Sequence, residues 1–448
     1  MSLVSRKIYP IVILLLGALP LMAQNLTSFS LEEAVNYAYD QSVDVKNARL
    51  RVLDAEQQII ERRSTGLPQL SADVNFQRYL QVPKQPLPEA FIQFLESLNP
   101  NGEVEREASF FLKNNFTAGL NLDMMIFDGT YFTALKAARA FREYTAQELI
   151  TTKRDIRSSV IDVYLPVLQL NKNIELIDKN VANLEKLLRE TKALYEEGFA
   201  EQLDVDRQQL SLNNLVVERE NQIRRRETAL ARLKYIIGYP ADEPLEISED
   251  IEEMAVEVAE GALTDAVNPR TRPEFVLTEE GIDLQELNVK VNKAAYLPSL
   301  NAYGGYQQAY QGNNFKDGFW APTANVGLRL SVPIFDGFYR KSQVERARIG
   351  LQEAQNQQRD LQRAINLEVT NARNSYLNAM EALEGQRENL ELAERIYETT
   401  QIKYREGVGS SVELTQAEQS LFQAQSNYTN TLYNVLSAKM DLQMALGN

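Results

Sequence analysis

One stretch of this sequence occurs twice, as FTAGLNLDMMIFDG at residues 116–129 and as ANVGLRLSVPIFDG at residues 324–337. In both copies apolar residues alternate with polar residues or glycine up to a shared Ile-Phe-Asp-Gly. Successive side chains of a strand point to opposite faces, so the alternation predicts a strand with one apolar and one polar face. After each glycine a helical pattern follows for roughly a hundred residues, with one Gly-marked break. The repeat predicts two corners at which a strand becomes a long helix.

Each predicted corner carries an Asp-Gly pair. Asp128 and Gly129 form the first, and Asp336 and Gly337 form the second. An Asp before a helix caps its N-terminus by accepting hydrogen bonds from free backbone amides, and Gly permits a sharp change of direction. We interpret these four residues as structural and assign them no chemistry.

Beyond these corners the two halves of the chain follow one plan. A helix of unusual length, about 100 Å at 1.5 Å per residue, is predicted over residues 130–197, and a return helix of about half that length over 202–237. Residues 338–406 and 412–446 repeat the plan, and the two copies align without a gap over this part. The pattern predicts a tandem duplication in which each copy has one structural job.

Domain organisation follows from the duplication. A first structural repeat is predicted over residues 24–240, with a helix at 31–64, a strand, an outer loop, a second strand, the long helix and the return helix. A second repeat is predicted over residues 272–448, and residues 241–271 read as an acidic linker on the outside of the helices. Only the insert at 79–115 breaks the register between the halves.

The N-terminus has the three parts of a secretory signal peptide. Arg6 and Lys7 precede an apolar run that is short for a membrane span, and Ala23 supplies a small residue at a cleavage point. Residues 1–23 are therefore predicted to be a signal peptide. Nothing after it approaches the ~18 consecutive apolar residues of a spanning helix, so any membrane insertion must use strands.

Composition excludes most catalytic and metal sites. The chain has no cysteine and no histidine, so thiolate ligands and the usual general base are missing. Its net charge of −15 argues against nucleic acid as a partner, because phosphate binding needs clustered Lys and Arg. We expect no enzyme activity, no cofactor and no bound metal.

The alternating segments have the length needed to cross a bilayer. They lie at residues 70–77, 116–127, 300–307 and 324–332. Four strands cannot close a barrel, and an open edge in lipid leaves backbone groups unpaired, so the chain must oligomerise. Two copies would give eight strands, a barrel filled by its own side chains, and three would give twelve, wide enough for a lumen. Because every strand joins a helix on the same side, we expect the barrel to stand on a helical cylinder.

These motifs resemble the TolC family of outer-membrane efflux channels. The resemblance rests on Leu-Pro-x-Leu before the odd strands, Pro-Ile-Phe-Asp-Gly after the fourth, and the Gly-containing turns, and it covers essentially all of the mature sequence. It implies a mainly α fold with a membrane β-barrel portion: a homotrimer in the Gram-negative outer membrane, in contact with its lipid, with a periplasmic tunnel of long coiled-coil helices. It also implies a passive export duct that works with a periplasmic adaptor protein and an inner-membrane transporter.

The resemblance places the two helix–helix turns at the periplasmic tip. It makes the residues of the turns candidates for adaptor docking, against the alternative that they only form tight turns. These residues are Gly198, Phe199, Gly407 and Val408.

The starts of the return helices supply candidates for a periplasmic gate. Asp204 and Glu413 lie where an acidic residue favours the positive end of a helix, which is one interpretation. The other places them in carboxylate rings that hold the gate or select cations. Tyr404 matches a tyrosine that family channels use in this constriction, whereas Gly409 stands where an Arg is often found and Gln416 where a second acidic ring lies.

A second class of function stays open from the sequence. Long helical hairpins are also compatible with a periplasmic adaptor or scaffold protein, although the four alternating strands and the duplication oppose it. The exported substrate, drugs, metals or proteins, leaves no signal that we can identify.

Overall fold

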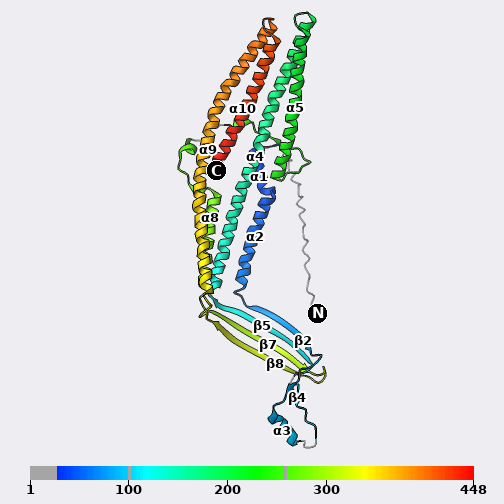
Figure 1. Cartoon of the computed structure of the whole chain (residues 1–448), viewed down its shortest axis with the longest axis vertical. Helices are drawn as coiled ribbons and strands as arrows, with labels where there is room; N and C mark the ends of the chain where they lie inside the picture. The colour runs from blue at the N-terminus through cyan, green and yellow to red at the C-terminus, as the bar shows by residue number, and fades with distance from the viewer. Residues whose placement is uncertain (1–27, 99–101, 110, 256–259, 448) are drawn as a thin grey trace, which may run out of the picture.

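The computed structural model describes residues 28–98, 102–109, 111–255 and 260–447. The predicted signal peptide lies outside the described residues. Long helices rise from one end of a four-stranded sheet, and the insert between the first two strands extends beyond the opposite end (Figure 1). The insert contains two short paired strands and one helix, β3 (Gln85–Pro86), α3 (Glu89–Leu98) and β4 (Glu107–Ala108).

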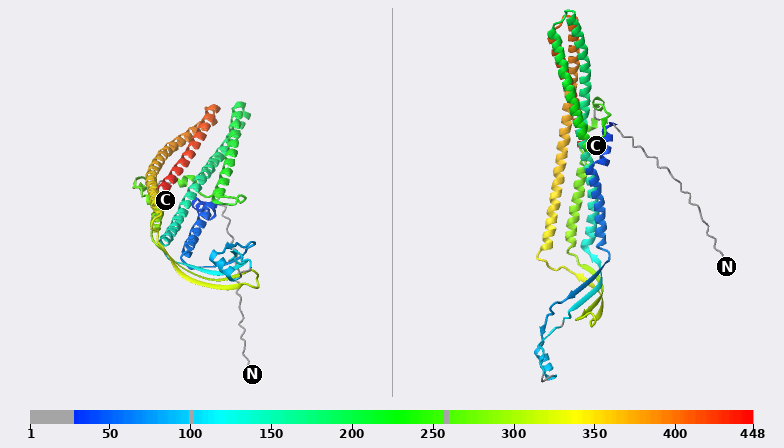
Figure 2. Two further views of the ribbon diagram at one scale, coloured as in Figure 1. Left: turned by 60° about the horizontal axis from the view of Figure 1, so that its bottom comes forward. Right: turned by 90° about the vertical axis from the view of Figure 1, so that its right-hand side faces the viewer.

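All four predicted strands are present and pair antiparallel in the order β2-β5-β7-β8. They are β2 (Gln69–Arg78), β5 (Asn114–Asp128), β7 (Ser299–Gly312) and β8 (Phe319–Ser331). The pairing keeps the predicted faces in register, because Leu70 lies opposite Leu122 and Leu300 opposite Leu330. The sheet is curved (Figure 2), and a β-bulge between Met125 and Phe127 interrupts the register next to the helices.

The duplication is visible in the helix lengths. In the first half α4 has 68 residues and α5 has 36, and in the second α9 has 67 and α10 has 36. We call α4 with α5 the first hairpin and α9 with α10 the second hairpin. Their bounds are α4 (Gly129–Glu196), α5 (Gln202–Ile237), α9 (Tyr339–Arg405) and α10 (Ser411–Leu446).

Nearer the sheet, two shorter helices complete a row in the order α2, α4, α8, α9, in which each helix contacts the next. They are α2 (Val43–Ser64) and α8 (Pro273–Ala294). The single helix predicted over residues 31–64 was wrong in one respect, since it breaks at Ser42 into α1 (Leu31–Gln41) and α2. Ser42 has extended backbone angles, which lets α1 contact α5 as well as α4, whereas α2 packs on α4.

The first corner forms as the sequence predicts. Asp128 caps α4, and its Oδ1 accepts hydrogen bonds from the backbone amides of Thr130 at 2.7 Å and Tyr131 at 3.3 Å. Gly129 is required for space, because a Cβ there would lie 2.5 Å from Leu297 Cδ1. The close approach of α8 therefore selects glycine.

The second corner differs from the prediction. Asp336 is not at the N-cap position, since α9 begins three residues later with Phe338 there. Pro333 lacks an amide hydrogen and cannot extend the ladder, and β8 ends at Ser331. Gly337 and Phe338 both have positive φ angles, which lengthens the turn. The Asp336 carboxylate still serves the first turn of α9, because its Oδ2 accepts from the Arg340 backbone amide at 3.1 Å. The same oxygen lies 3.0 Å from Arg340 Nη1.

The two corners predict unequal mutational costs. Asp128→Ala should lower the free energy of unfolding by about 1 kcal/mol, the usual cost of removing a capping carboxylate. Asp336→Ala should cost less, because Asp336 accepts from one helix amide where Asp128 accepts from two, and its partly exposed ion pair with Arg340 adds little. Chemical denaturation followed by circular dichroism compares the two variants. Equal losses, or a larger loss at Asp336, would show that the difference between the corners has no energetic weight.

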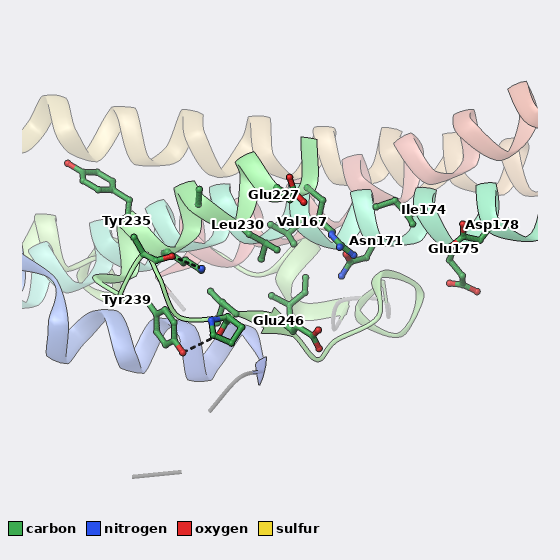
Figure 3. A pocket seen from close by; sticks show the side chains of 17 residues that line it. Val167, Asn171, Ile174, Glu175, Asp178, Glu227, Leu230, Tyr235, Tyr239 and Glu246 are labelled. Carbon is green, nitrogen blue, oxygen red and sulfur yellow. Dashed lines mark hydrogen bonds between the residues drawn. The ribbon is translucent and has the colours of Figure 1, made fainter. Parts of the chain in front are cut away.

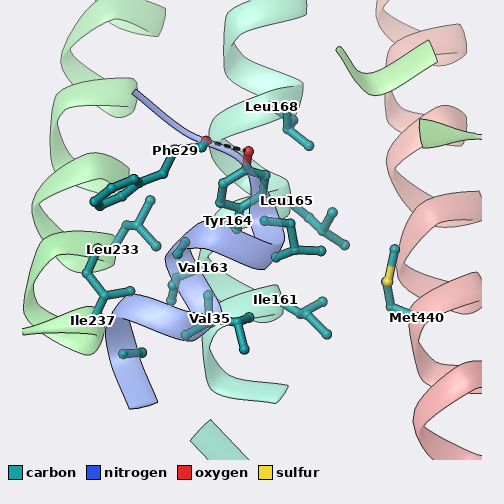
Figure 4. Packing of buried hydrophobic residues seen from close by; sticks show 14 of the residues in the cluster. Phe29, Val35, Ile161, Val163, Tyr164, Leu165, Leu168, Leu233, Ile237 and Met440 are labelled. Atoms are coloured by element: carbon teal, nitrogen blue, oxygen red, sulfur yellow. Dashed lines mark hydrogen bonds between the residues drawn. The ribbon is translucent and has the colours of Figure 1, made fainter. Parts of the chain in front are cut away.

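The main hydrophobic core lies at mid-height, where α1, α4 and the end of α5 meet the segment after the first hairpin (Figure 4). Tyr164 of α4 is fully buried there, and its hydroxyl donates to the Phe29 carbonyl at 2.9 Å. Residues 241–271, predicted to be an acidic linker on the outside of the helices, contribute buried Leu245 and Ile251 to this core. This segment contains β6 (Glu246–Ile247), paired with β1 (Ser28–Phe29), and α6 (Ile251–Met254), α7 (Glu260–Thr264) and the 3-10 turn η1 (Pro269–Thr271).

A buried arginine directly after this segment connects three helices of the second half of the chain. Arg272 is 4% exposed, and its Nη1 donates to the Ala445 carbonyl at 2.8 Å. Its Nε donates to Glu274 at 2.6 Å and its Nη2 to Glu368 at 3.0 Å. One guanidinium therefore joins the start of α8 to α9 and to the end of α10.

Candidate functional site

The two helix–helix turns have the same backbone geometry. Gly198 and Gly407 each follow a long helix with φ near the left-handed value, +79° and +74°. No atom lies within 4 Å of a Cβ placed on either, so conformation and not space selects glycine. The next residue donates back into the helix in both turns, Phe199 to Leu194 at 2.8 Å and Val408 to Lys403 at 2.9 Å. This is the Schellman pattern that ends a helix sharply.

The turns present apolar side chains at the end of the molecule farthest from the sheet (Figure 1). Phe199 is 82% exposed and Val408 is 78% exposed. An apolar side chain that a turn holds in solvent is not buried by its own chain and does not stabilise the fold. The arrangement suits contact with another protein.

A polar network joins the first turns of the two return helices. The Ser411 hydroxyl at the start of α10 donates to Asp204 Oδ1, and Arg207 Nη1 donates to the Ser411 hydroxyl at 2.8 Å. Asp204 also accepts from the Glu201 amide at 3.1 Å, which completes a capping box at the start of α5. Asp204 thus caps its own helix, which is the first of the two roles considered, and it also contacts the start of α10 in the other hairpin.

Tyr404 lies in the same region at the end of α9. Its side chain belongs to an apolar cluster with Leu187 of α4 and Leu414 of α10, and only 7% of it is exposed. Burial raises the pKa of the Tyr404 hydroxyl, the Asp204 carboxylate raises it further, and the Thr191 hydroxyl opposes them. Tyr404 and Asp204 both line a cavity of 550 Å³ between the two turns.

Glu413 does not join this network. It is the third residue of α10, and its backbone amide donates to Ser410 Oγ at 3.2 Å as part of a capping box. Its side chain is exposed. It does not line the cavity between the turns. Within one chain, two of the predicted gate residues, Asp204 and Tyr404, therefore lie together, and the third, Glu413, faces solvent.

Sequence reasoning missed the cations that complete the site. Gly409 lacks the Arg expected there, but Arg207 comes from the neighbouring helix, and Arg405 forms a bidentate pair with Glu190 of α4 at 2.8 and 3.3 Å. Two signals were available, since Arg207 lies one turn after Asp204 and Arg405 directly follows Tyr404. Neither spacing shows that the two hairpins meet through them.

A larger cavity of 980 Å³ lies away from the tip, between the middle of α4, the end of α5 and the loop after it (Figure 3). Its lining mixes apolar side chains such as Leu230 with charges of both signs, including Glu175, Arg226 and Lys234. None of the predicted docking or gate residues lines it.

Across the residues that the structure describes, no group of three or more Asp or Glu side chains is arranged to hold a metal ion. Among the described helices, none is long and apolar enough to cross a membrane.

Comparisons with known proteins agree over nearly the whole chain. The family model described as "Outer membrane efflux protein" matches residues 34–239 and 271–448. The pyoverdine export outer membrane protein OpmQ of Pseudomonas putida is 23% identical over 93% of this chain and 85% of its own length. Outer membrane protein TolC of Vibrio cholerae is 20% identical over 78% of this chain and 80% of its own length. The crystal structure of VceC from Vibrio cholerae superimposes with a TM-score of 0.70 at 16% identity, covering 93% of this chain and 96% of that one. This chain belongs to the outer membrane efflux protein family.

Proposed function

We propose that three copies of this outer-membrane efflux channel assemble into a passive duct, with a twelve-stranded barrel in the membrane and a helical tunnel in the periplasm. The tips of the tunnel dock a periplasmic adaptor protein, and an inner-membrane transporter supplies the cargo and the energy. The chain itself performs no chemistry.

The observation that carries this proposal is that the open edges of the sheet and of the helix row coincide. In the described part of the chain, β2 and β8 each pair on one side only, and they join α2 and α9, the end members of the helix row. Both end helices expose apolar side chains, Leu50 and Leu53 on α2 and Ile349 on α9. Pairing β8 of one copy with β2 of the next, and α9 with α2, leaves no edge when the ring closes.

The faces of the sheet support a membrane position. The apolar face is widely exposed, with Val326 at 90% and Leu328 at 68%. The other face carries Asp73, Asn121 and Arg329, and Asn121 donates to Asp73 at 2.7 Å across the strands. An apolar exterior against lipid and a polar, water-filled interior satisfy both faces.

The gate proposal rests on the network between the hairpins. Asp204, Arg207 and Ser411 hold the starts of α5 and α10 together, and Tyr404 fills the space behind them. In a trimer these contacts repeat three times around the narrow end of the tunnel, where Glu413 contributes a further acidic ring. Breaking them lets the hairpins separate and widens the passage.

Mass and conductance test the duct. The mature protein in detergent should have the mass of three chains. A planar bilayer should show a low, cation-selective single-channel conductance, because the chain has a net charge of −15 and the proposed gate contains an acidic ring. Val326→Arg should prevent membrane assembly, since an Arg facing lipid costs about 2–4 kcal/mol per chain near the bilayer centre. The matched change Asn325→Arg on the polar face should leave the trimer intact. A monomer, or a water-soluble protein without conductance, would overturn the proposal in favour of a scaffold.

A further inference from the structure

A carboxylate without a partner is buried where the two hairpins meet. Glu418 of α10 is 1% exposed, and in the described part of the chain neither of its carboxylate oxygens has a hydrogen-bond partner. Its helix neighbours Leu414 and Leu421 belong to the apolar cluster of the tip. A glutamate in such surroundings has no structural reason to be there, because leucine would pack without the cost of desolvating a charge.

Helix periodicity shows which way Glu418 faces. Ser411 and Gln425 lie seven residues before and after it, so the three side chains share one stripe of α10. Ser411 contacts Asp204 and Arg207 of α5, and Gln425 accepts from Asn180 of α4 at 2.6 Å. Both outer members of the stripe therefore contact the first hairpin, and Glu418 lies between them on the same side.

The side chains opposite the stripe offer no compensating charge. Because α4 and α10 run in opposite directions, the partner of Glu418 seven residues from Asn180 is Leu187, which is buried with Leu184. From α9 the titratable neighbour is Tyr397, and beyond it Arg405 and Glu190 neutralise one another.

We call the contact between the two hairpins the seam, and its α5 side also offers Glu418 no compensating charge. Arg207 and Asp204 lie toward the start of α5 and are engaged with Ser411. One turn further along, Gln208 is fully buried, and both polar atoms of its side chain lack partners among the described residues. The seam between the hairpins therefore contains polar groups that packing leaves unsatisfied.

Such a carboxyl is stable in the packed seam only when it is protonated. Burial raises the pKa of Glu418 to about 7, well above the ordinary value for a glutamate. Burial also raises the pKa of the adjacent Tyr397 hydroxyl to about 12, with the Glu418 carboxylate adding to the rise. The tyrosine therefore stays neutral over the range in which the glutamate titrates.

We propose that Glu418 is a proton-binding site that couples the packing of the two hairpins to pH. It holds a proton while the hairpins pack together, and it releases the proton to water when they separate. This inference rests on the proposed gate, whose opening it would make dependent on proton concentration.

The direction of the pH dependence follows from comparing the packed hairpins with the separated hairpins. Below about pH 4.5 the carboxyl is protonated in both, and the packed state carries no penalty. As pH rises toward 7, the separated state ionises first, so packing weakens progressively. Above 7 the penalty is constant, and it corresponds to about a 300-fold shift toward separated hairpins. An acidic periplasm therefore holds the tip packed, and a neutral one loosens it.

Infrared difference spectroscopy of the intact protein, with isotope-labelled glutamate, tests the site without reference to transport. A protonated carboxyl band should be present at pH 6, disappear by pH 8 and be absent from Glu418→Gln. Glu398→Gln, an exposed neighbour of Tyr397 with the same change in charge, should keep the band. A band that is missing at pH 6, or that survives in Glu418→Gln, would overturn the proton site.

Spin labels test the coupling. The natural chain has no cysteine, so labels can be placed at Glu197→Cys and Glu406→Cys, one in each turn. The distance between them should broaden and lengthen from pH 5.5 to pH 8 in the parent and in Glu398→Gln, and stay constant in Glu418→Gln. A titrating band with unchanging distances would overturn the coupling alone. Absence of conductance in every variant, with the band and distances as expected, would instead refute the channel.

Discussion

Replacing Arg272 with methionine should lower the free energy of unfolding of the helical region by about 3–5 kcal/mol. The guanidinium is almost completely buried and contacts two carboxylates and the Ala445 carbonyl. Methionine fills a similar volume but leaves Glu368 without its counter-charge. Glu274, which is 19% exposed, keeps the Arg154 guanidinium at 3.5 Å. A buried charge without its partner is the costly part of such a change. Thermal and chemical unfolding, followed by the helical circular dichroism signal, measures the loss.

Arg270→Met is the matched control for this prediction. Arg270 lies two residues earlier and pairs with Glu279 at 2.9 Å, but its side chain is 71% exposed. We expect its loss to change stability by less than about 1 kcal/mol. If both variants unfold alike, the junction of α8, α9 and α10 does not depend on the buried guanidinium.

Removing the Asp204 carboxylate should open the periplasmic tip. In Asp204→Ala the Ser411 hydroxyl loses its acceptor and Arg207 loses its nearby counter-charge. A hydrogen bond to a charged group contributes about 1.5–3 kcal/mol, so each chain should shift toward separated hairpins by about tenfold or more. Single-channel recordings should show larger or longer openings than those of the parent protein.

Asp206→Ala provides the comparison, because Asp206 is exposed two residues away and accepts only from Gln202 on its own helix. Its conductance should match the parent protein. Ser411→Ala should reproduce the Asp204→Ala phenotype, and the double variant should add little, since both changes remove the same contact. An unchanged conductance in Asp204→Ala would show that this network is not part of the gate.

The sequence predicted the sheet and the helix plan well because both depend on local periodicity. Alternation predicted each strand, and glycine predicted each turn, since no other residue adopts the φ of Gly198 or Gly407 without strain. The break at Ser42 was not predictable, because it accompanies the contact of α1 with α5, a helix far along the chain. Asp336 was expected at the N-cap position, which Phe338 occupies with a positive φ angle that the Asp-Gly motif does not indicate. Its carboxylate nevertheless accepts from the Arg340 amide in the first turn of α9.

Only part of the candidate site was predicted, because sequence patterns identify single residues and not the distant residues that they contact. Asp204 and Tyr404 could be identified by aligning the halves of the chain and by resemblance. Their partners depend on contacts between residues about two hundred positions apart, such as Arg207 with Ser411 and Glu190 with Arg405. Glu418 was missed because a single glutamate in an amphipathic helix is ordinarily a solvent-facing residue.

The unequal turns of the two hairpins have a consequence for stoichiometry. The proposed ring of three chains would present six turns of nearly the same backbone shape, with phenylalanine and valine alternating at their ends. Behind them, an Asp204 that contacts the other hairpin would alternate with a Glu413 that caps its own helix. A partner that binds as six identical subunits must adapt to two chemical surfaces in alternation. A partner that binds as three subunits meets the same surface at each position. The differences between the duplicated halves therefore determine how many copies of a partner can bind with equal affinity.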